Sequence, residues 1–214
     1  MTLEAEGEVE LTPRAIPDPA RTAPWEAVRD AVRQDLSDDG LLALGMVFES
    51  PHVQISRALT ELAQPSFAPG RPLLEASLDL IGRIHRGFEY RPGATSLPEV
   101  LAVRQGVCQD FAHLAIGCLR ALGIPARYVS GYLRTLPPPG APRLVGADAS
   151  HAWLSVHCGA DGWIDLDPTN DQAVCSGYLT LGWGRDYGDV SPIKGVILGG
   201  GEHRIDVSVD VEER

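Results

Sequence analysis

The sequence has 214 residues, enough for one large domain or two small ones with a substantial core. Hydrophobic residues make up 44% and charged residues 22%, which are ordinary globular values and argue against wholesale disorder. The net charge of -11 argues against nucleic acid and anionic membrane surfaces as partners, because both attract clustered Lys and Arg. No apolar run is long enough to predict a transmembrane helix, and the acidic start does not resemble a signal peptide.

The first 24 residues predict a strand followed by a linker. Residues 2–11 alternate partly between apolar and acidic side chains, as a half-exposed strand does, and the prolines that follow are expected to break regular structure. An isolated strand cannot bury a face by itself, so we expect it to join the main sheet or to be the last strand of something absent from this sequence. Residues 1–24 are therefore assigned as a strand-like remnant and linker, and residues 25–214 as the main domain.

The following hundred residues predict mostly helices, because apolar residues recur at three- and four-residue steps. Helices are predicted over residues 25–36, 56–62, 73–88, 96–104 and 108–122. Asp38-Asp39-Gly40 predicts a turn, and Ser96 with Glu99 predicts a capping box. Gly123 and Pro125 are expected to end the last helix.

After Pro125 the pattern changes from helical to strand-like. Strands are predicted over residues 127–133, 151–158, 162–167 and 203–211, with a loop at 137–140. A long polar, glycine-containing segment at 171–189 is a candidate surround for an active site. Helices followed by antiparallel strands indicate an α+β domain.

One cysteine is placed for nucleophilic chemistry. Cys108 begins the predicted helix 108–122, where unpaired backbone N–H groups and the positive end of the helix dipole favour a thiolate. His151 and then Asp167 follow in the chain, which supplies a base and a group to orient it. The backbone N–H of Cys108 is a candidate oxyanion donor. These residue types indicate acyl transfer or amide hydrolysis.

The relation between the base and its orienting carboxylate follows from a predicted hairpin. Gly159-Ala160-Asp161-Gly162 is a turn signal, and a hairpin centred on residue 159 places His151 opposite Asp167. Opposed Cβ atoms lie about 5 Å apart, close enough for a carboxylate to hold an imidazole N–H. Asp167 is therefore preferred as the orienting residue. Asp165 is the competitor if the register slips by two residues.

Three segments carry a resemblance to a known family. GVCQDFAHLAIGCLRALGIPARYVSGY, ASHAWLSV and GWIDLDPTND are similar, in this order, to the catalytic segments of the transglutaminase-like branch of the papain-like thiol enzymes. The similarity covers roughly residues 73–214. It implies a papain-like core with Cys108 as nucleophile, His151 as base and Asp167 as orienting carboxylate. Bacterial members usually carry an N-terminal β-rich domain, of which this sequence has only a strand-like remnant.

The sequence thus predicts a thiol enzyme that acts on amide bonds of a protein or peptide. Hydrolysis by a peptidase or amidase is preferred to acyl transfer from glutamine, because bacterial members are commonly described as peptidases. The alternative is a non-catalytic binding or scaffold module on the same fold. A cytoplasmic location is expected, since four cysteines are too sparse for a disulfide scaffold. No cofactor or metal is predicted, because no EF-hand or familiar zinc spacing occurs.

Most other chemically active residue types are interpreted as structural. Packing or other structural roles are expected for Cys118, Cys158, His113, Trp153 and Trp163. Nothing recommends Cys175 as a reactive thiol, and His157 is expected to be solvated near the turn. Asp186 and Asp189 are expected to order a loop near the site. Tyr90 is a candidate oxyanion donor whose position the sequence does not fix.

Overall fold

The computed structural model describes residues 6–12, 15–92, 96–134, 150–174 and 176–191, together with Val209. The helices are α1 (Trp25–Val32), α2 (Asp38–Gly45), α3 (Arg57–Ala63), α4 (Leu73–Gly87), α5 (Leu97–Val103), α6 (Cys108–Ala121) and α7 (Tyr187–Val190). The strands are β1 (Glu89–Tyr90), β2 (Gln105–Gly106), β3 (Ala126–Leu133), β4 (Ser150–His157), β5 (Trp163–Asp167), β6 (Gln172–Ala173) and β7 (Tyr178–Gly184).

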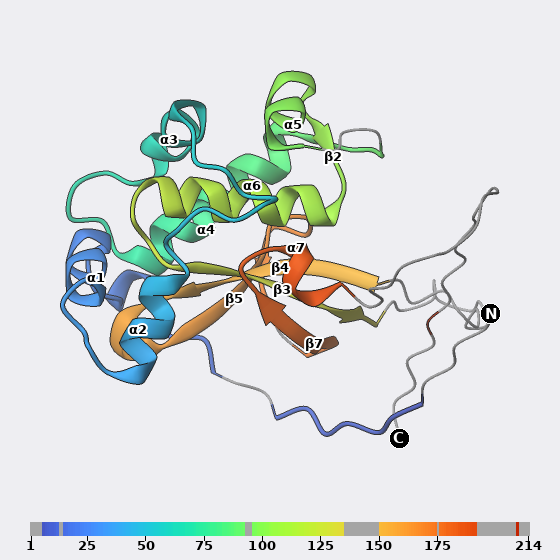
Figure 1. Ribbon diagram of the computed structural model, residues 1–214, viewed down its shortest axis with the longest axis horizontal. Coiled ribbons are helices and arrows are strands. Elements are labelled where there is room, and N and C mark those ends of the chain that lie inside the picture. The colour runs from blue at the N-terminus through green and yellow to red at the C-terminus, as the bar shows by residue number, and fades with distance from the viewer. Residues whose placement is uncertain are drawn as a thin grey trace.

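A five-stranded antiparallel sheet and a central helix form the framework. The strand order is β6-β5-β4-β3-β7. Helix α6 packs on β3 and β4, and α3, α4 and α5 pack in turn on α6, so that these helices lie on one side of the sheet (Figure 1). This arrangement confirms the predicted α+β class with a papain-like plan, in which a helix that begins with a cysteine packs on an antiparallel sheet.

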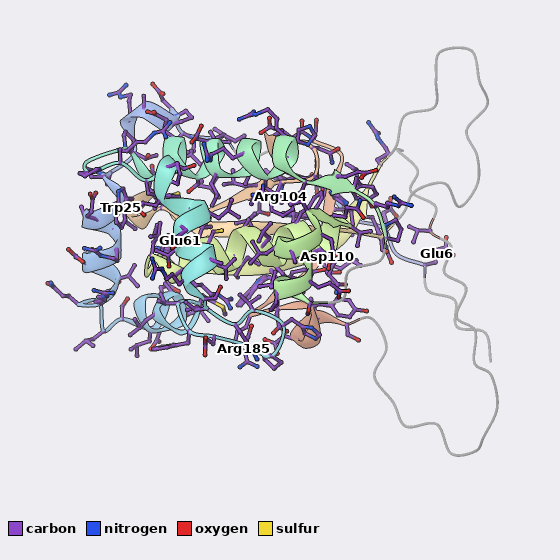
Figure 2. All side chains as sticks on the ribbon, turned by 90° about the horizontal axis from the view of Figure 1, so that it is seen from above. Glu6, Trp25, Glu61, Arg104, Asp110 and Arg185 are labelled. Atoms are coloured by element: carbon purple, nitrogen blue, oxygen red, sulfur yellow. The ribbon has the colours of Figure 1, made fainter. Side chains whose placement is uncertain are left out.

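The main hydrophobic core lies between α6 and the sheet. Every residue of α6 from Asp110 to Arg120 is buried, because the helix has other helices on one side and strands on the other. The side chains of Ala152, Leu154 and Val156 on β4 join this core, as the two-residue period of a strand requires. Charged residues such as Glu61 and Arg185 lie on the outside of the molecule (Figure 2).

The five predicted helices are present, but two local predictions are wrong. Asp38-Asp39-Gly40 does not form an isolated turn, because these residues begin α2 and the Ser37 hydroxyl accepts the N–H of Gly40 at 3.1 Å. Ser37 thus acts as an N-cap that the sequence interpretation missed. The predicted capping box at α5 does not form either, since the Ser96 side chain makes no capping hydrogen bond.

The N-terminal strand prediction is not supported in its described part. Residues 6–11 are exposed and adopt no strand, and residues 1–5 lie outside the described residues. Regular structure also begins before residue 25, with a 3-10 helix at Pro19–Arg21. The hydroxyl of Thr22 accepts the N–H of Leu74 at 3.1 Å, so this segment packs on the N-terminus of α4, where Pro72 offers no side-chain cap.

Strands β3, β4 and β5 match their predicted ranges to within one residue at each end. The segment 171–189 is not simply a polar loop, because it contains β6, β7 and α7, and β7 forms the edge of the sheet beside β3. The predicted loop 137–140 and, apart from Val209, the predicted strand 203–211 lie outside the described residues. Within the described residues, no helix has the length and apolar character needed to cross a membrane.

Candidate active site

Cys108 is the first residue of α6, as predicted, and the bend before it requires a glycine. A Cβ atom on Gly106 would lie 2.8 Å from Cβ of Asp110 and 3.2 Å from the ring of Phe111. The Asp110 carboxylate turns back and accepts the N–H of Val107 at 2.9 Å, which fixes the first turn of the helix. The thiol of Cys108 is free and partly exposed at this position. It therefore lies where a helix N-terminus stabilises negative charge.

His151 at the start of β4 reaches Asp167 at the end of β5. Its Nε2 atom lies 2.7 Å from Oδ2 of Asp167, with the His side chain 9% and the Asp side chain 0% exposed. The Cys108 side chain is a second hydrogen-bond partner of the imidazole. Because Nε2 faces Asp167, Nδ1 is the ring nitrogen left to face the thiol. The structure thus brings together the three residues that the sequence singled out.

The predicted hairpin register is nevertheless wrong by two residues. Leu154 pairs with Leu166 and His157 with Trp163, so the hairpin is centred on residue 160 rather than 159. The connection contains a 3-10 turn closed by the N–H of Cys158 and the carbonyl of Gly162 at 2.7 Å. Continuing this register places Asp167 opposite Trp153. Its carboxylate reaches the imidazole of His151 diagonally, within the range of neighbouring strands.

The carboxylate of Asp167 is held by donors beyond His151. Oδ1 accepts the N–H groups of Thr169 and Asn170 at 2.8 and 3.2 Å. Oδ2 accepts the side-chain amide of Asn170 at 2.6 Å and the hydroxyl of Tyr178 at 2.6 Å. Gln172 in turn donates to the Tyr178 oxygen at 2.9 Å. Asn170 could have been suspected from its closeness to Asp167 in the sequence, whereas Tyr178 was indicated only by its place in the segment 171–189, which was expected to surround the site.

Two aromatic rings flank the imidazole of His151. Trp153 and Tyr178 lie 6.0 and 5.9 Å from it between ring centroids, and 5.3 Å from each other. The Trp153 side chain is fully buried, which confirms its predicted packing role, and its indole N–H donates to Oδ2 of Asp165 at 3.1 Å. Asp165 therefore serves the indole of Trp153 rather than the imidazole. The imidazole ring is confined between fixed neighbours.

The electrostatics of the pair favour a charged imidazole. Burial would lower the pKa of His151, but its hydrogen bond to Asp167 and the interaction with Cys108 outweigh the effect of burial and raise the pKa to about 9. Burial would likewise raise the pKa of Asp167, yet the hydrogen bonds from His151, Tyr178 and Asn170 hold it below its usual value. At neutral pH the site therefore contains an imidazolium beside a carboxylate.

Tyr90 is positioned next to Cys108 by a short strand pair. β1 runs parallel to β2 with Tyr90 paired to Gly106, and the N–H of Arg91 donates to the Gly106 carbonyl at 2.8 Å. The Tyr90 ring packs edge-on against Phe111 of α6, with 6.1 Å between centroids. Its hydroxyl is a hydrogen-bond partner of both the side chain and the backbone of Cys108. The residue whose position the sequence left open thus lies at the thiol.

The remaining cysteines and acidic residues have structural surroundings. Cys118 and Cys158 are buried in the core, as predicted, and burial raises the pKa of the Cys158 thiol to about 12. Asp186 accepts the N–H groups of His52 and Gly188, which agrees with a loop-ordering role. Cys175 lies outside the described residues. Among the residues described, no group of three or more His, Cys, Asp or Glu could hold a metal ion.

His157 differs from the prediction. It was expected to be solvated, but it is half-buried, and its ring packs on Trp163 with 5.1 Å between centroids. The longer turn at 158–162 brings the end of β4 and the start of β5 into direct pairing, which places these two rings side by side.

Comparison with known proteins identifies the family of this fold and site. A family model described as the transglutaminase-like superfamily matches residues 60–168, a range that includes Cys108, His151 and Asp167. An uncharacterized protein of Mycobacterium tuberculosis is 50% identical over 197 residues, which cover 88% of this chain and 61% of that protein. The chain therefore spans about three fifths of the length of this mycobacterial relative.

Two further relatives carry functional descriptions of their own. A protein-glutamine gamma-glutamyltransferase of Pseudomonas aeruginosa is 33% identical over 119 residues, covering 53% of this chain and 18% of that protein. The crystal structure of a proposed cysteine protease from Cytophaga hutchinsonii matches with a TM-score of 0.60 and 32% identity. That match covers 74% of this chain and 51% of the other chain.

Proposed function

The chain belongs to the transglutaminase-like superfamily, and we propose that it is a thiol-dependent enzyme acting on amide bonds of a protein or peptide. In this proposal Cys108 is the nucleophile, His151 the base and Asp167 the residue that orients the base. The observation that carries it is the contact of His151 with both Cys108 and Asp167, the latter at 2.7 Å, at the N-terminus of α6.

The proposed reaction has two balanced steps. The Cys108 thiolate attacks the amide carbonyl, and the imidazolium of His151 gives its proton to the leaving amine as the C–N bond breaks and a thioester forms. His151, now neutral, takes a proton from water, and the resulting hydroxide attacks the thioester and releases a carboxylic acid and the Cys108 thiolate beside the re-formed imidazolium. Asp167 keeps the imidazole oriented and stabilises its charged form in both steps.

Tyr90 completes the proposed site as the second oxyanion donor. Its hydroxyl is a partner of the Cys108 backbone and side chain, next to the point where a substrate carbonyl would be attacked. The tetrahedral intermediate places a negative oxygen at this point, and a phenolic O–H together with the Cys108 N–H supplies two hydrogen bonds to it.

Within this class we propose hydrolysis rather than transamidation. The solved structure of a proposed cysteine protease, which matches 74% of the chain with a TM-score of 0.60, supports this preference. A glutamine peptide incubated with a labelled primary amine separates the two reactions. Ammonia release, or peptide-bond cleavage, without label incorporation is the expected result. Label incorporation that exceeds hydrolysis would assign the enzyme to the acyltransferases.

Iodoacetamide tests whether the protein is an enzyme rather than a scaffold. We expect Cys108 to be alkylated near neutral pH faster than Cys118 and Cys158, which are buried, and the His151→Ala substitution to slow its alkylation. Peptide mapping by mass spectrometry resolves these three thiols and that of Cys175, the fourth cysteine of the sequence. A Cys108 no more reactive than the buried thiols, in a protein that His151→Ala leaves unchanged, would favour a non-catalytic module.

The cytoplasmic location and the domain division also stay proposals. Cys108, Cys118 and Cys158 are free thiols, a state that a reducing compartment preserves. We propose that the catalytic unit extends to residue 214, as expected from the sequence. The packing of Thr22 on α4 supports an N-terminal boundary of this unit before residue 19 rather than at residue 25.

A further inference from the structure

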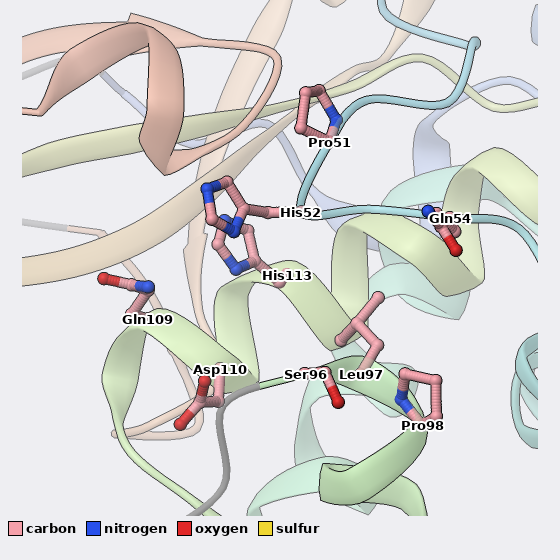
Figure 3. A pocket seen from close by; sticks show the side chains of 9 residues that line it. All are labelled: Pro51, His52, Gln54, Ser96, Leu97, Pro98, Gln109, Asp110 and His113. Atoms are coloured by element: carbon pink, nitrogen blue, oxygen red, sulfur yellow. The ribbon is translucent and has the colours of Figure 1, made fainter.

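A hollow lies beside the N-terminal turns of α6. It has a volume of about 190 Å³ and lies between the loop that contains His52 and Gln54, the start of α5 at Ser96, and α6 (Figure 3). Gln109, the residue that follows Cys108, forms one wall. We call it the His52 pocket. A group bound there contacts Gln109, the neighbour of Cys108 in the sequence.

The walls of the His52 pocket are held in place by contacts outside it. The rings of His52 and His113 are stacked, with 5.6 Å between centroids and 3° between planes. The backbone N–H of His52 donates to Asp186 at 2.9 Å, and Nε2 of His113 accepts the N–H of Tyr187 at 3.1 Å. Both walls therefore keep their positions without a ligand, which lowers the entropy that binding would cost.

The charge of the His52 pocket is negative. Asp110 lines it, and only its Oδ2 atom is used by the N–H of Val107, so the carboxylate has acceptor capacity left. Burial and the negative charge of Glu99 raise the pKa of Asp110, whereas the hydrogen bond from the N–H of Val107 lowers it. Burial lowers the pKa of His113 to about 4, so this imidazole carries no compensating charge at neutral pH. The described lining residues include no lysine or arginine.

The size of the His52 pocket fits a single side chain. Sites for whole small molecules usually measure about 300–1,000 Å³, which is more than this hollow offers. Its floor at Asp110 and His113 is buried, whereas its rim at His52, Gln54 and Ser96 is exposed. One side chain of a peptide can therefore reach the floor while the backbone of the peptide stays at the rim.

We propose that the His52 pocket is a subsite for a basic side chain, lysine or arginine, of a polypeptide that binds across the N-terminus of α6. Its ammonium or guanidinium group donates to Asp110, and its alkyl stem lies along the stacked imidazoles. The inference rests on the proposed function for its link to catalysis, since the occupant is a neighbour of the reacting amide. The binding itself does not require turnover.

Peptide binding to the Cys108→Ala protein tests the subsite without catalysis. The probes are capped hexapeptides with one glutamine and one varied neighbour, either lysine, glutamate or the neutral norleucine, placed in turn at each flanking position. At one position we expect the lysine peptide to bind about two- to five-fold more tightly than the norleucine peptide, because the cost of desolvating the two charges offsets most of their attraction. The glutamate peptide is expected to bind most weakly there. Isothermal titration gives the dissociation constants.

Charge changes at the rim provide the matched control. Gln54→Glu should increase the ratio of the affinity for the lysine peptide to that for the norleucine peptide about two- to five-fold. Gln54→Lys should decrease this affinity ratio to the same extent. Gln34 is exposed beyond the end of α1, so Gln34→Glu and Gln34→Lys make the same net charge changes far from the pocket and should leave the ratio unchanged.

Two results would overturn the subsite. One is that no peptide binds, or that lysine, norleucine and glutamate peptides bind equally at every position. The other is a preference that the Gln54 variants shift no more than the Gln34 variants. A clear preference for lysine in a protein whose unmutated form turns over no peptide would instead refute the proposed enzyme function and leave the subsite standing.

Discussion

Nε2 of His151 and Oδ2 of Asp167 lie 2.7 Å apart, although the register of β4 and β5 does not place the two residues opposite each other. The contact is diagonal across the strand pair, and the carboxylate is fixed by Tyr178 and Asn170 from outside the pair. Its geometry therefore depends on the segment after β5 as much as on the hairpin. The predictions that follow concern this contact and its surroundings.

Substitution of the three central residues should give a graded loss of activity. Cys108→Ala should abolish turnover and His151→Ala should be nearly as damaging, because each removes a reacting group. Asp167→Asn should reduce kcat about 10²- to 10⁴-fold, since it disturbs only the orientation and charge of the base. Asp165→Asn is the control, because its carboxylate binds the indole of Trp153. If Asp165→Asn lost most of its activity while Asp167→Asn kept nearly normal activity, Asp165 would be the residue that orients His151.

Removal of the Tyr90 hydroxyl should reduce the stabilisation of the transition state more than it reduces the affinity for substrate. Tyr90→Phe keeps the edge-on ring contact with Phe111 but loses the hydroxyl at Cys108. We expect kcat to fall about 10- to 100-fold, with KM changed less than three-fold, as for a lost oxyanion donor. Steady-state kinetics on one peptide substrate measure both constants. A variant that raises KM and spares kcat would make Tyr90 a substrate-binding residue.

Tyr178→Phe should lower both stability and activity through Asp167. The hydroxyl of Tyr178 donates to the buried carboxylate at 2.6 Å, and loss of a hydrogen bond to a charged group costs about 1–3 kcal/mol. Urea denaturation measures the change in the free energy of unfolding. Tyr187→Phe serves as the control, because it removes a hydroxyl from a ring that packs on Tyr128 at a distance from Asp167. Equal effects of the two substitutions would contradict this role.

The pH dependence of stability should reveal the charged imidazole. The pKa of His151 is raised to about 9 in the folded protein, against about 6.5 in an unfolded chain. A raised pKa stabilises the protonated form, so this contribution is fully present below pH 6.5 and disappears as the pH rises through 9. It amounts to roughly 3 kcal/mol at most.

Two measurements check this pH dependence. NMR titration of the imidazole should give a midpoint near pH 9, and the stability difference between the wild type and His151→Ala should shrink between pH 6.5 and pH 9. Cys108→Ala should lower the midpoint, because Cys108 contributes to the raised pKa of His151. A titration near pH 6.5 in both proteins would mean that the imidazole is not paired in solution.

A glycine in β3 should be indispensable for the sheet around the site. A Cβ atom at Gly131 would overlap the carbonyl oxygen of Leu179 in β7 and lie 2.5 Å from the ring of Trp153. We expect Gly131→Ala to cost about 2 kcal/mol or more of unfolding free energy, because both neighbours are fixed. Gly45 at the end of α2 has open space, so Gly45→Ala should stabilise by up to about 1 kcal/mol. Thermal unfolding of both variants tests the contrast.

Local patterns in the sequence were sufficient for five of the helices and for the position of Cys108, whereas α2 and α7 were not predicted. The apolar period of residues 73–88 and 108–122 predicts α4 and α6 closely, because a helix that buries one face must repeat its apolar residues at the helical period. The glycine-containing bend before Cys108 and the order Cys108, His151, Asp167 also follow from the sequence. Side-chain types and short spacings carry this information, and it does not depend on distant contacts.

Only the tertiary structure decided the contacts between residues that are far apart in the sequence. The guanidinium of Arg120 is buried in α6 and binds the carbonyls of Phe48, Ala126 and Arg185, an environment that no local pattern predicts for an arginine. Tyr178 reaches Asp167 from the edge strand β7, which the sequence suggested only as part of a polar loop.

The register of the β4–β5 hairpin was also decided by the tertiary structure. A shift of two residues keeps every side chain on its own face of the sheet, so the alternation of apolar and polar residues cannot distinguish the two registers. The conformation of the turn at 158–162 sets the register, and the donors around Asp167 then fix where its carboxylate meets His151. The sequence alone predicted which residues lie together at the candidate site, whereas their contacts were decided by packing between segments far apart in the chain.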